Sequence, residues 1–254
     1  MAAITQALLT SGGTTVDATS FATASITPSA NKLVLAAVFA AKTGGSVTPT
    51  LSGNGLTWVQ VGTDTVSTGV YRTTVFRAMG ASPSAGAVTI DFGADTQVRC
   101  GWIISEFTNI NTSGTNGSGA IVQSVTNTTT TGNSLIVTLA AFGDANNATF
   151  GGFGIVSDTP TTVTPGTGFT EIAELNIGAD DQFIQTEWRN NNDTTVDASW
   201  DGVGGTPGAI GIAVEIKNAT SSSSVKTYKG LAVASVKTVK GLAIASRKTK
   251  KGLA

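Results

Sequence analysis

Short apolar runs, some alternating with polar residues and some continuous, follow one another along residues 1–217 and are separated by Gly, Pro, Asn and Ser. Runs of this kind, bounded by turn residues, predict β-strands, and no segment has the period of an amphipathic helix. The predicted strands are KLVLAAVFAA, LTWVQV, VYRTTVFRA, AVTIDF, CGWIISEF, AIVQSV, SLIVTLAAF, FTEIAEL, QFIQTEWR and AIGIAVEI. The pattern therefore predicts an all-β fold, an antiparallel β-sandwich of jelly-roll type.

The order of these segments indicates that the fold is built from two related halves. NKLVLAAVF matches NSLIVTLAAF, GLTWVQV matches GFTEIAEL, and YRTTVFRA matches FIQTEWRN. The matches place Phe76 over Trp188, Arg77 over Arg189, Phe92 over Trp200 and Glu106 over Glu215. A general likeness among Thr- and Val-rich strands is the alternative explanation. A duplication fits one sandwich or two in tandem, and we favour one domain because only NTSGTNGSG separates the halves.

Charge divides the chain into two parts at residue 217. Residues 1–217 contain seven Lys and Arg against sixteen Asp and Glu, a net charge of −9, whereas residues 218–254 contain eight Lys and Arg and no acid. So complete a division predicts two parts with different roles. The segment NATSSSS, residues 218–224, has the composition of a flexible linker.

The basic part repeats the unit V-K-T-x-K-G-L-A-x-A-S twice and begins it a third time. Its Gly, Thr and β-branched residues disfavour a helix, so we predict a short strand at VKTVK, a turn at Lys-Gly and a second strand at LAIAS. The apolar residues are too few to form a core alone and must pack on the body, on a neighbouring subunit or on copies of themselves.

We therefore predict a short C-terminal β-repeat tail, residues 218–254, that serves as an assembly arm. The predicted arm residues are Val225, Lys226, Lys229, Leu231, Val233, Val236, Lys237, Lys240, Leu242, Ile244, Arg247, Lys248, Lys250, Lys251 and Leu253. The acidic body of a neighbouring copy is a fitting partner for these cations, which favours a homo-oligomer. Nucleic-acid binding and a disordered solubilising tail are the two competing interpretations. The first is disfavoured because Tyr228 is the only aromatic residue in the tail.

Two motifs resemble those of bacteriophage structural proteins. An N-x-L-x-V strand, then GLTW and an aromatic-rich strand, repeated and closed by AVEIKNA, is similar to β-sandwich modules of phage and bacterial surface proteins. VKTVKGLAIAS resembles the IKTINGxSIxGSG phrase of phage tail fibres, with Lys240 in place of Asn before Gly241. The resemblance implies a virion component, a capsid decoration or fibre protein, without shared catalytic residues.

The residues offer little for catalysis. The chain has no histidine, which removes Ser-His and Cys-His nucleophile pairs, and Cys100 lies in an apolar run typical of a core. Glu171 with Glu174, or Asp180 with Asp181, are carboxylate pairs by proximity alone, and solvated surface charges explain them better. GGFG at Gly151 is interpreted as turn glycine and not as a phosphate loop. We expect no enzyme activity, no cofactor and no metal.

Four tryptophans leave a second function open. Trp58, Trp102, Trp188 and Trp200 all lie in strand patterns, which favours core positions over a sugar-stacking platform. We predict a non-enzymatic structural component of a phage-like virion that interacts with virion proteins and with copies of itself. Without a signal peptide it is expected to be made in the host cytoplasm, and without a long apolar segment it is not expected to enter a membrane. A carbohydrate-binding adhesion module that recognises a surface glycan is the alternative.

Overall fold

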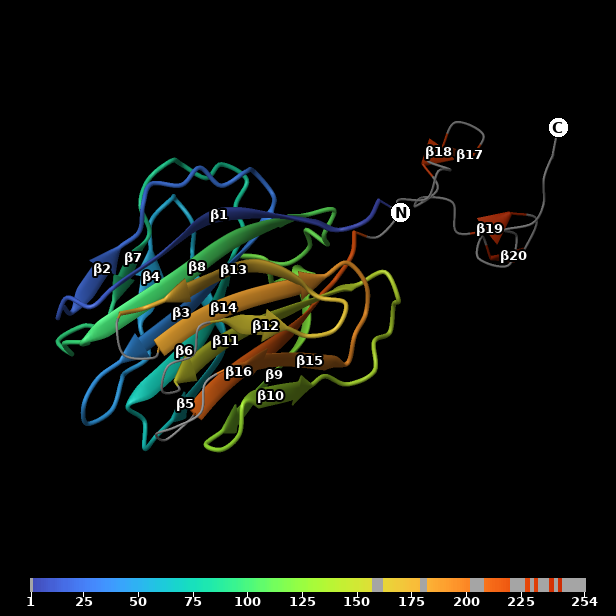
Figure 1. Cartoon of the computed structure of the whole chain (residues 1–254). Coiled ribbons are helices and arrows are strands. Elements are labelled where there is room, and N and C mark those ends of the chain that lie inside the picture. The colour runs from blue at the N-terminus through green and yellow to red at the C-terminus, as the bar shows by residue number, and fades with distance from the viewer. Residues whose placement is uncertain are drawn as a thin grey trace. The chain divides into compact units, whose positions relative to one another are not determined.

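The chain forms two compact units, residues 1–219 and 220–254. The computed structural model describes residues 2–156, 162–178, 182–201 and 208–219 of the first unit and four two-residue strands of the second. Among these residues every strand pairing is antiparallel, and the one helical element is a 3-10 turn, Ser118–Ala120. The first unit, called the body below, is therefore all-β, as predicted, with antiparallel sheets packed on one another (Figure 1).

The first half of the body is a sandwich of eight strands. A five-stranded sheet has the order β1-β8-β3-β6-β5, and a three-stranded sheet has the order β2-β7-β4. The strands are β1 (Thr5–Thr14), β2 (Ser20–Ala22), β3 (Leu33–Ala41), β4 (Thr50–Ser52), β5 (Val59–Val66), β6 (Tyr71–Ala78), β7 (Thr89–Asp91) and β8 (Arg99–Thr108).

The second half repeats this topology strand for strand. Its large sheet has the order β9-β16-β11-β14-β13 and its small sheet the order β10-β15-β12, so each strand takes the place of the strand eight positions earlier. The strands are β9 (Ile121–Thr129), β10 (Ser134–Thr138), β11 (Ala148–Val156), β12 (Val163–Pro165), β13 (Thr170–Asn176), β14 (Gln182–Arg189), β15 (Thr195–Trp200) and β16 (Gly208–Ile216). The prediction of two related halves is thereby confirmed. The first and last strands of each half are neighbours, as in a jelly roll.

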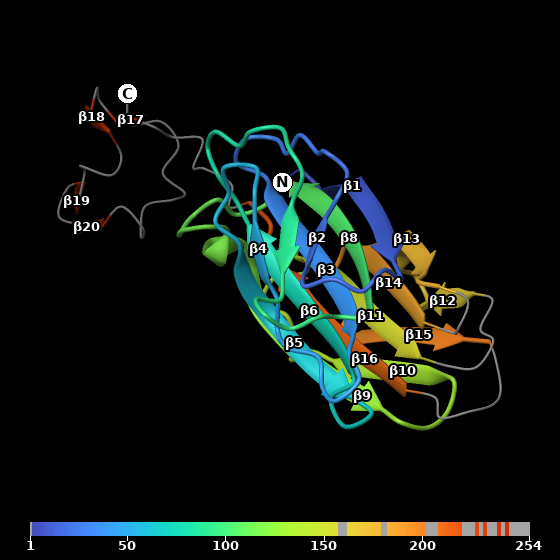
Figure 2. The ribbon, with the colours of Figure 1, turned by 90° about the vertical axis from the view of Figure 1, so that its left-hand side faces the viewer.

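The four sheets lie in four layers with three apolar cores between them. One core fills the space between the sheets of the first half and includes Phe21, Ile90 and Trp102. Its counterpart in the second half includes Phe153 and Trp200. A third core lies between the two large sheets, and Figure 2 shows the small-sheet strands β4 and β12 on opposite sides of the stack. Each half is therefore a sandwich of its own, and the two are joined back to back.

The contact between the halves has the pattern of a two-fold symmetric interface. β1 packs against β13 while β9, its counterpart, packs against β5; β8 meets β14 while β16 meets β6. Exchanging the halves maps each of these contacts onto another, as in a dimer with the same surface on both partners. The body thus resembles a dimer whose subunits are fused in one chain.

Central strands of the large sheets are buried on both faces, which explains their composition. Every residue of β3 and β16 is buried. β3 is therefore a continuous apolar run, and β16 is apolar except for Glu215, whose carboxylate accepts hydrogen bonds from the Gln123 and Asn147 side chains. β11 was not predicted, because its GGFG sequence was assigned to a turn. Its glycines lie within the strand and allow close packing: a Cβ on Gly154 would lie 2.2 Å from Cδ2 of Phe39 and from Oγ1 of Thr73.

Three of the predicted matches between the halves are wrong. NKLVLAAVF forms β3, whose counterpart is β11, whereas NSLIVTLAAF contains β10, a short strand of the small sheet. Phe76 is matched in register by Glu187 and not by Trp188, since Phe76 pairs with Ala36, Glu187 pairs with Gly151, and these partners occupy equivalent positions. The same register matches Arg77 with Trp188 and not with Arg189. A slip of one residue turns a side chain to the opposite face of a sheet. The matches of Phe92 with Trp200 and of Glu106 with Glu215 agree with the strand registers.

The body ends two residues later than the sequence division at 217. Asn218 is buried and its backbone N–H donates to Oδ1 of Asn147, and the Ala219 N–H donates to the Asn109 carbonyl. Both residues belong to the body because their backbone is hydrogen-bonded within it. Among the described residues, no helix is long and apolar enough to span a membrane.

Candidate functional site

Two hairpins in the second unit reproduce the eleven-residue repeat. β17 (Thr227–Tyr228) pairs with β18 (Leu231–Ala232), and β19 (Thr238–Val239) pairs with β20 (Leu242–Ala243). Thr227 faces Ala232 and Thr238 faces Ala243, so the second pairing is the first moved by eleven residues. The sequence between the paired strands is Lys-Gly in both repeats, and glycine is favoured in two-residue hairpin connections. The predicted strands agree with these pairings, and the predicted turn at Lys-Gly lies outside the described residues.

The backbones of Leu231 and Leu242 lie within these strands, one in each repeat. The remaining predicted arm residues lie outside the described residues: Val225, Lys226, Lys229, Val233, Val236, Lys237, Lys240, Ile244, Arg247, Lys248, Lys250, Lys251 and Leu253. Their role as an assembly arm stays a prediction.

The tryptophans lie in or against the cores of the body. The exposed fractions of Trp102 and Trp200 are 7% and 4%. Trp58 is half-buried against the core of the first half, and Trp188 is half-buried against the core between the halves, where its ring meets Phe107 edge-on. The prediction of core positions is confirmed for Trp102 and Trp200.

A group of carboxylates lies where the small and large sheets of the second half meet. β12 and β13 are edge strands of their sheets, and the Val163 N–H of β12 donates to Glu174 Oε2 of β13 at 2.6 Å. Glu171 and Glu174 are three residues apart and would face opposite sides of a regular strand. A bulge between Glu171 and Ala173 places both on the side that faces β12, opposite Glu187 and Gln185 of β14.

The group is called the acidic seam below. It consists of Glu171, Glu174, Glu187, Asp193, Asp197 and Asp201. Burial raises the pKa of Glu174, and the charges of Glu171 and Asp201 add to the rise. Burial also raises the pKa of Asp197, with a contribution from Asp193. These mutual effects indicate that the carboxylates share one region of negative potential.

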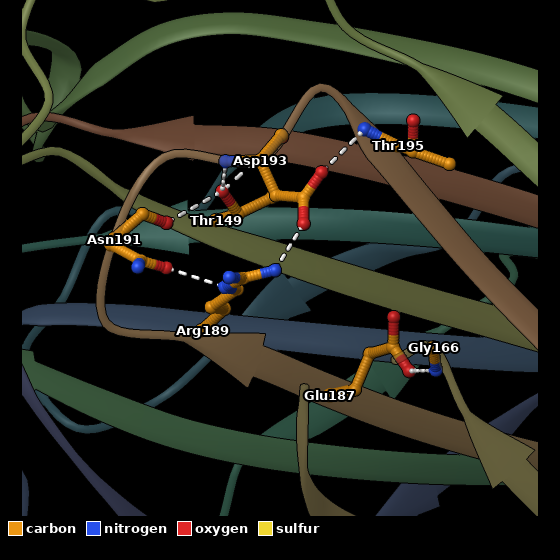
Figure 3. A network of polar contacts seen from close by, with 7 residues as sticks. All are labelled: Thr149, Gly166, Glu187, Arg189, Asn191, Asp193 and Thr195. Atoms are coloured by element: carbon orange, nitrogen blue, oxygen red, sulfur yellow. Dashed lines mark hydrogen bonds and ion pairs between the residues drawn. The ribbon is translucent and has the colours of Figure 1, made fainter. Parts of the chain in front are cut away.

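Glu187 is the buried member of the seam. Its side chain is fully buried, its Oε2 accepts the Gly166 N–H at 3.0 Å, and its Oε1 has no hydrogen-bond partner among the described residues (Figure 3). Burial raises its pKa to about 8; the Gly166 hydrogen bond and the neighbouring Gln185 side chain oppose the rise, and the charges of Asp197 and Asp193 add to it. At neutral pH this carboxyl is therefore mostly protonated.

Arg189 brings a positive charge to one end of the seam. Its NH1 donates to Asp193 Oδ2 and its Nε to Asn191 Oδ1 (Figure 3). Asp193 in turn accepts the Thr195 N–H at 2.9 Å, and its own N–H donates to Thr149 Oγ1 at 3.0 Å. The network fixes the turn between β14 and β15, because it satisfies backbone groups that no strand pairs.

The other residues weighed for chemistry form no site among the described residues. Cys100 is buried, and burial raises the pKa of its thiol, so the thiolate needed for a nucleophile is suppressed. Asp180 and Asp181 lie outside the described residues. Among the described residues, no three His, Cys, Asp or Glu side chains are grouped so that they could hold a metal ion.

Sequence reasoning missed the acidic seam as a unit. Glu171 and Glu174 were noted as a pair, but the bulge that turns them to one side and the strand pairing that adds Glu187 are tertiary features. One available signal was the distribution of charge within the body. Residues 1–119 contain five acids and five cations, whereas residues 120–219 contain eleven acids and two cations.

Comparison of the chain with known protein families, with characterised proteins and with solved structures finds no match. Function is therefore inferred from two features of the chain itself. They are the charge and repeat of the second unit and the acidic seam of the body.

Proposed function

We propose that this protein is a non-enzymatic structural component of a phage-like virion, made in the host cytoplasm, in which the body is displayed and the C-terminal arm attaches or oligomerises it. The observation that carries the proposal is the repeat of one hairpin register after eleven residues, in a unit separate from the body and opposite to it in charge. Periodic segments of this kind bury their apolar side chains only against neighbours.

The construction of the body supports a structural role. Three apolar cores occupy four layers, and the central strands β3 and β16 are buried along their whole length. Such a body is stabilised by extensive apolar burial. A rigid module of this type suits display on a particle surface.

The arm supplies the two kinds of interaction that an attachment segment needs, apolar contacts and charge. Each repeat holds Leu and a β-branched or small apolar residue, and these contribute affinity when they are buried. The Lys and Arg residues speed the encounter with an acidic protein surface and select it. Virion proteins and other copies of the chain are the partners we expect.

Substitution of the arm leucines in the full chain tests the proposal. Leu231→Ser, Leu242→Ser and Leu253→Ser together should abolish attachment to particles and self-association, measured by particle co-sedimentation and light scattering. Replacing the eight cations by Gln should mainly slow association and reduce its salt dependence. Unchanged attachment in the leucine variant would overturn the assembly arm.

The competing roles of the arm give different rankings of the same two variants. A nucleic-acid-binding tail requires the cations and not the leucines, and its binding to added DNA falls steeply with salt. A solubilising tail is insensitive to both variants. Either ranking contradicts the proposal.

A further inference from the structure

The net charge of the body is confined to its second half. Residues 1–119 have no net charge, with five acids and five cations, and residues 120–219 have a net charge of −9, with eleven acids and two cations. The halves share one topology, so the fold does not require this asymmetry. A surface on the second half is therefore the natural partner for a segment with eight positive charges.

The acidic seam is the part of the second half where described carboxylates gather. Glu171 and Asp201 are exposed, and Glu174, Asp193 and Asp197 are partly exposed. Glu174 and Asp197 have raised pKa values, caused by burial and by neighbouring carboxylates, so a cation that approaches them relieves repulsion. Ile136, which pairs with Asp197 across β10 and β15, is 51% exposed and offers an apolar contact on the same face.

The seam also includes edge strands, whose outer backbone groups can pair with another strand. β13 and β12 are edge strands of their sheets, and edge strands can receive a further strand. The arm contains short antiparallel strands of its own. Its cations recur in pairs three residues apart, Lys226 with Lys229, Lys237 with Lys240 and Lys248 with Lys251, so each repeat presents two positive charges.

We propose that the acidic seam is the docking surface for the C-terminal arm of another copy of this chain. This inference rests on the proposed assembly function of the arm and adds the surface that receives it. Charge complementarity selects the second half over the first, and the arm's leucines, with Ile136 as one apolar contact on the face, supply the buried contact. The arrangement links molecules head to tail.

Neutralising the seam in the full chain is the first test. Glu171→Gln, Asp197→Asn and Asp201→Asn keep the side-chain shapes, and Asn at 201 can still accept the Thr162 N–H. We expect the association constant, measured by sedimentation equilibrium, to fall roughly tenfold and its salt dependence to become shallower, as for partly exposed charge pairs.

The matched control removes three carboxylates outside the seam. Asp17→Asn, Asp91→Asn and Asp144→Asn change the net charge by the same amount, and Asn at 91 and 144 can still accept the Gly93 and Asn146 N–H groups. This variant should associate like the original protein. Equal weakening in both variants, or no weakening in the seam variant, overturns the docking surface, as does a full-length protein that is monomeric at every concentration tested.

A charge exchange between two variants tests whether the contact joins different molecules. One variant has Glu171→Lys, Asp197→Lys and Asp201→Lys. The other exchanges all six paired lysines of the arm, Lys226→Glu, Lys229→Glu, Lys237→Glu, Lys240→Glu, Lys248→Glu and Lys251→Glu, which makes the arm net negative because only Arg247 and Lys250 remain as cations. Neither should associate alone, because arm and seam then have the same sign, and a mixture of the two should associate. A mixture that stays dissociated contradicts the proposal.

The leucine variant separates failure of this inference from failure of the proposed function. If the leucine variant loses attachment while the seam variant keeps it, the arm is an assembly element that docks elsewhere, and the seam is excluded. If neither variant changes attachment, both the arm and the seam are excluded.

Discussion

The two halves of the body place different side chains at the same edge, where the small sheet meets the large sheet. In the first half, Leu56 and Trp58 lie between β4 and β5 and pack with Phe76 against the apolar core. In the second half, Phe169 takes the register position of Trp58 and packs against the core, but the position of Phe76 is occupied by Glu187. The surrounding strands and turns add five more carboxylates. This edge is thus closed by apolar burial in the first half, which stabilises the fold, and gathers like charges in the second half, which oppose it.

The difference shows which of these residues the fold itself does not require. A fold that tolerates Phe at one of two equivalent positions has no structural need for a buried carboxyl at the other. The carboxylates lower the stability of the second half at neutral pH because they are partly desolvated and repel one another. The docking role that we propose for the seam would give these carboxylates a function, and the first half shows what the same backbone does without them.

The largest effect is expected at the apolar edge of the first half. Phe76→Ala should lower the free energy of unfolding by about 3–5 kcal/mol, because it empties a site where Phe76 is 4% exposed. Since a third core joins the halves, both should lose stability together in one transition. Hydrogen exchange of β7 and β15, followed by mass spectrometry, reports each half separately.

Val122→Ala is the control for this variant. Val122 is 50% exposed, so its truncation should change the free energy of unfolding by less than about 0.5 kcal/mol. Two separate transitions in the Phe76→Ala protein, with β15 unaffected, would show that the halves unfold independently and would contradict the shared transition.

The next effect is a pH dependence that originates at Glu187. Its pKa is raised to about 8 in the folded protein from an ordinary 4.5, so the folded state holds a proton that the unfolded state releases. The stabilisation is present in full below pH 4.5 and is lost as the pH rises to about 8, a change of about 2–4 kcal/mol. Urea unfolding at a series of pH values measures the slope.

Glu187→Gln should remove most of this slope and make the protein more stable than the original at pH 8. The Gln side chain can still accept the Gly166 N–H and carries no charge to desolvate. Glu171→Gln is the control for the loss of one carboxylate from the exposed part of the seam. A Glu187→Gln protein with the original pH profile would mean that burial of this carboxyl has no energetic consequence.

The sequence predicted the fold class and the duplication but not the layers or the seam. Strand periodicity predicts ten of the sixteen strands of the body in their order and misses β1, β2, β4, β11, β12 and β15. β11 is missed because its glycines resemble turn residues, and only tertiary neighbours, such as Phe39 and Thr73 beside Gly154, explain them. The match of Phe76 with Trp188 aligns two aromatic residues that lie one register position apart. Register, which fixes the face of each side chain, is set by pairing between distant strands. The bulge beside Glu171 is equally invisible in the sequence.

The smallest effect is expected at Arg189, where stability and docking should change in opposite directions. Arg189→Gln removes a partly exposed ion pair with Asp193 and should cost about 0.5–1 kcal/mol of stability, less at high salt. The same change leaves the acidic seam more negative, so the arm of another copy should bind slightly more tightly. For this variant, urea unfolding measures the change in stability and sedimentation equilibrium measures the change in association. Lys217→Gln, which removes an exposed cation at the end of β16, is the control. An electrostatic docking surface should bind the arm more tightly when it loses its own cation. If Arg189→Gln instead associates more weakly and is also less stable, the seam affects association only through the stability of the fold, and the docking surface is contradicted.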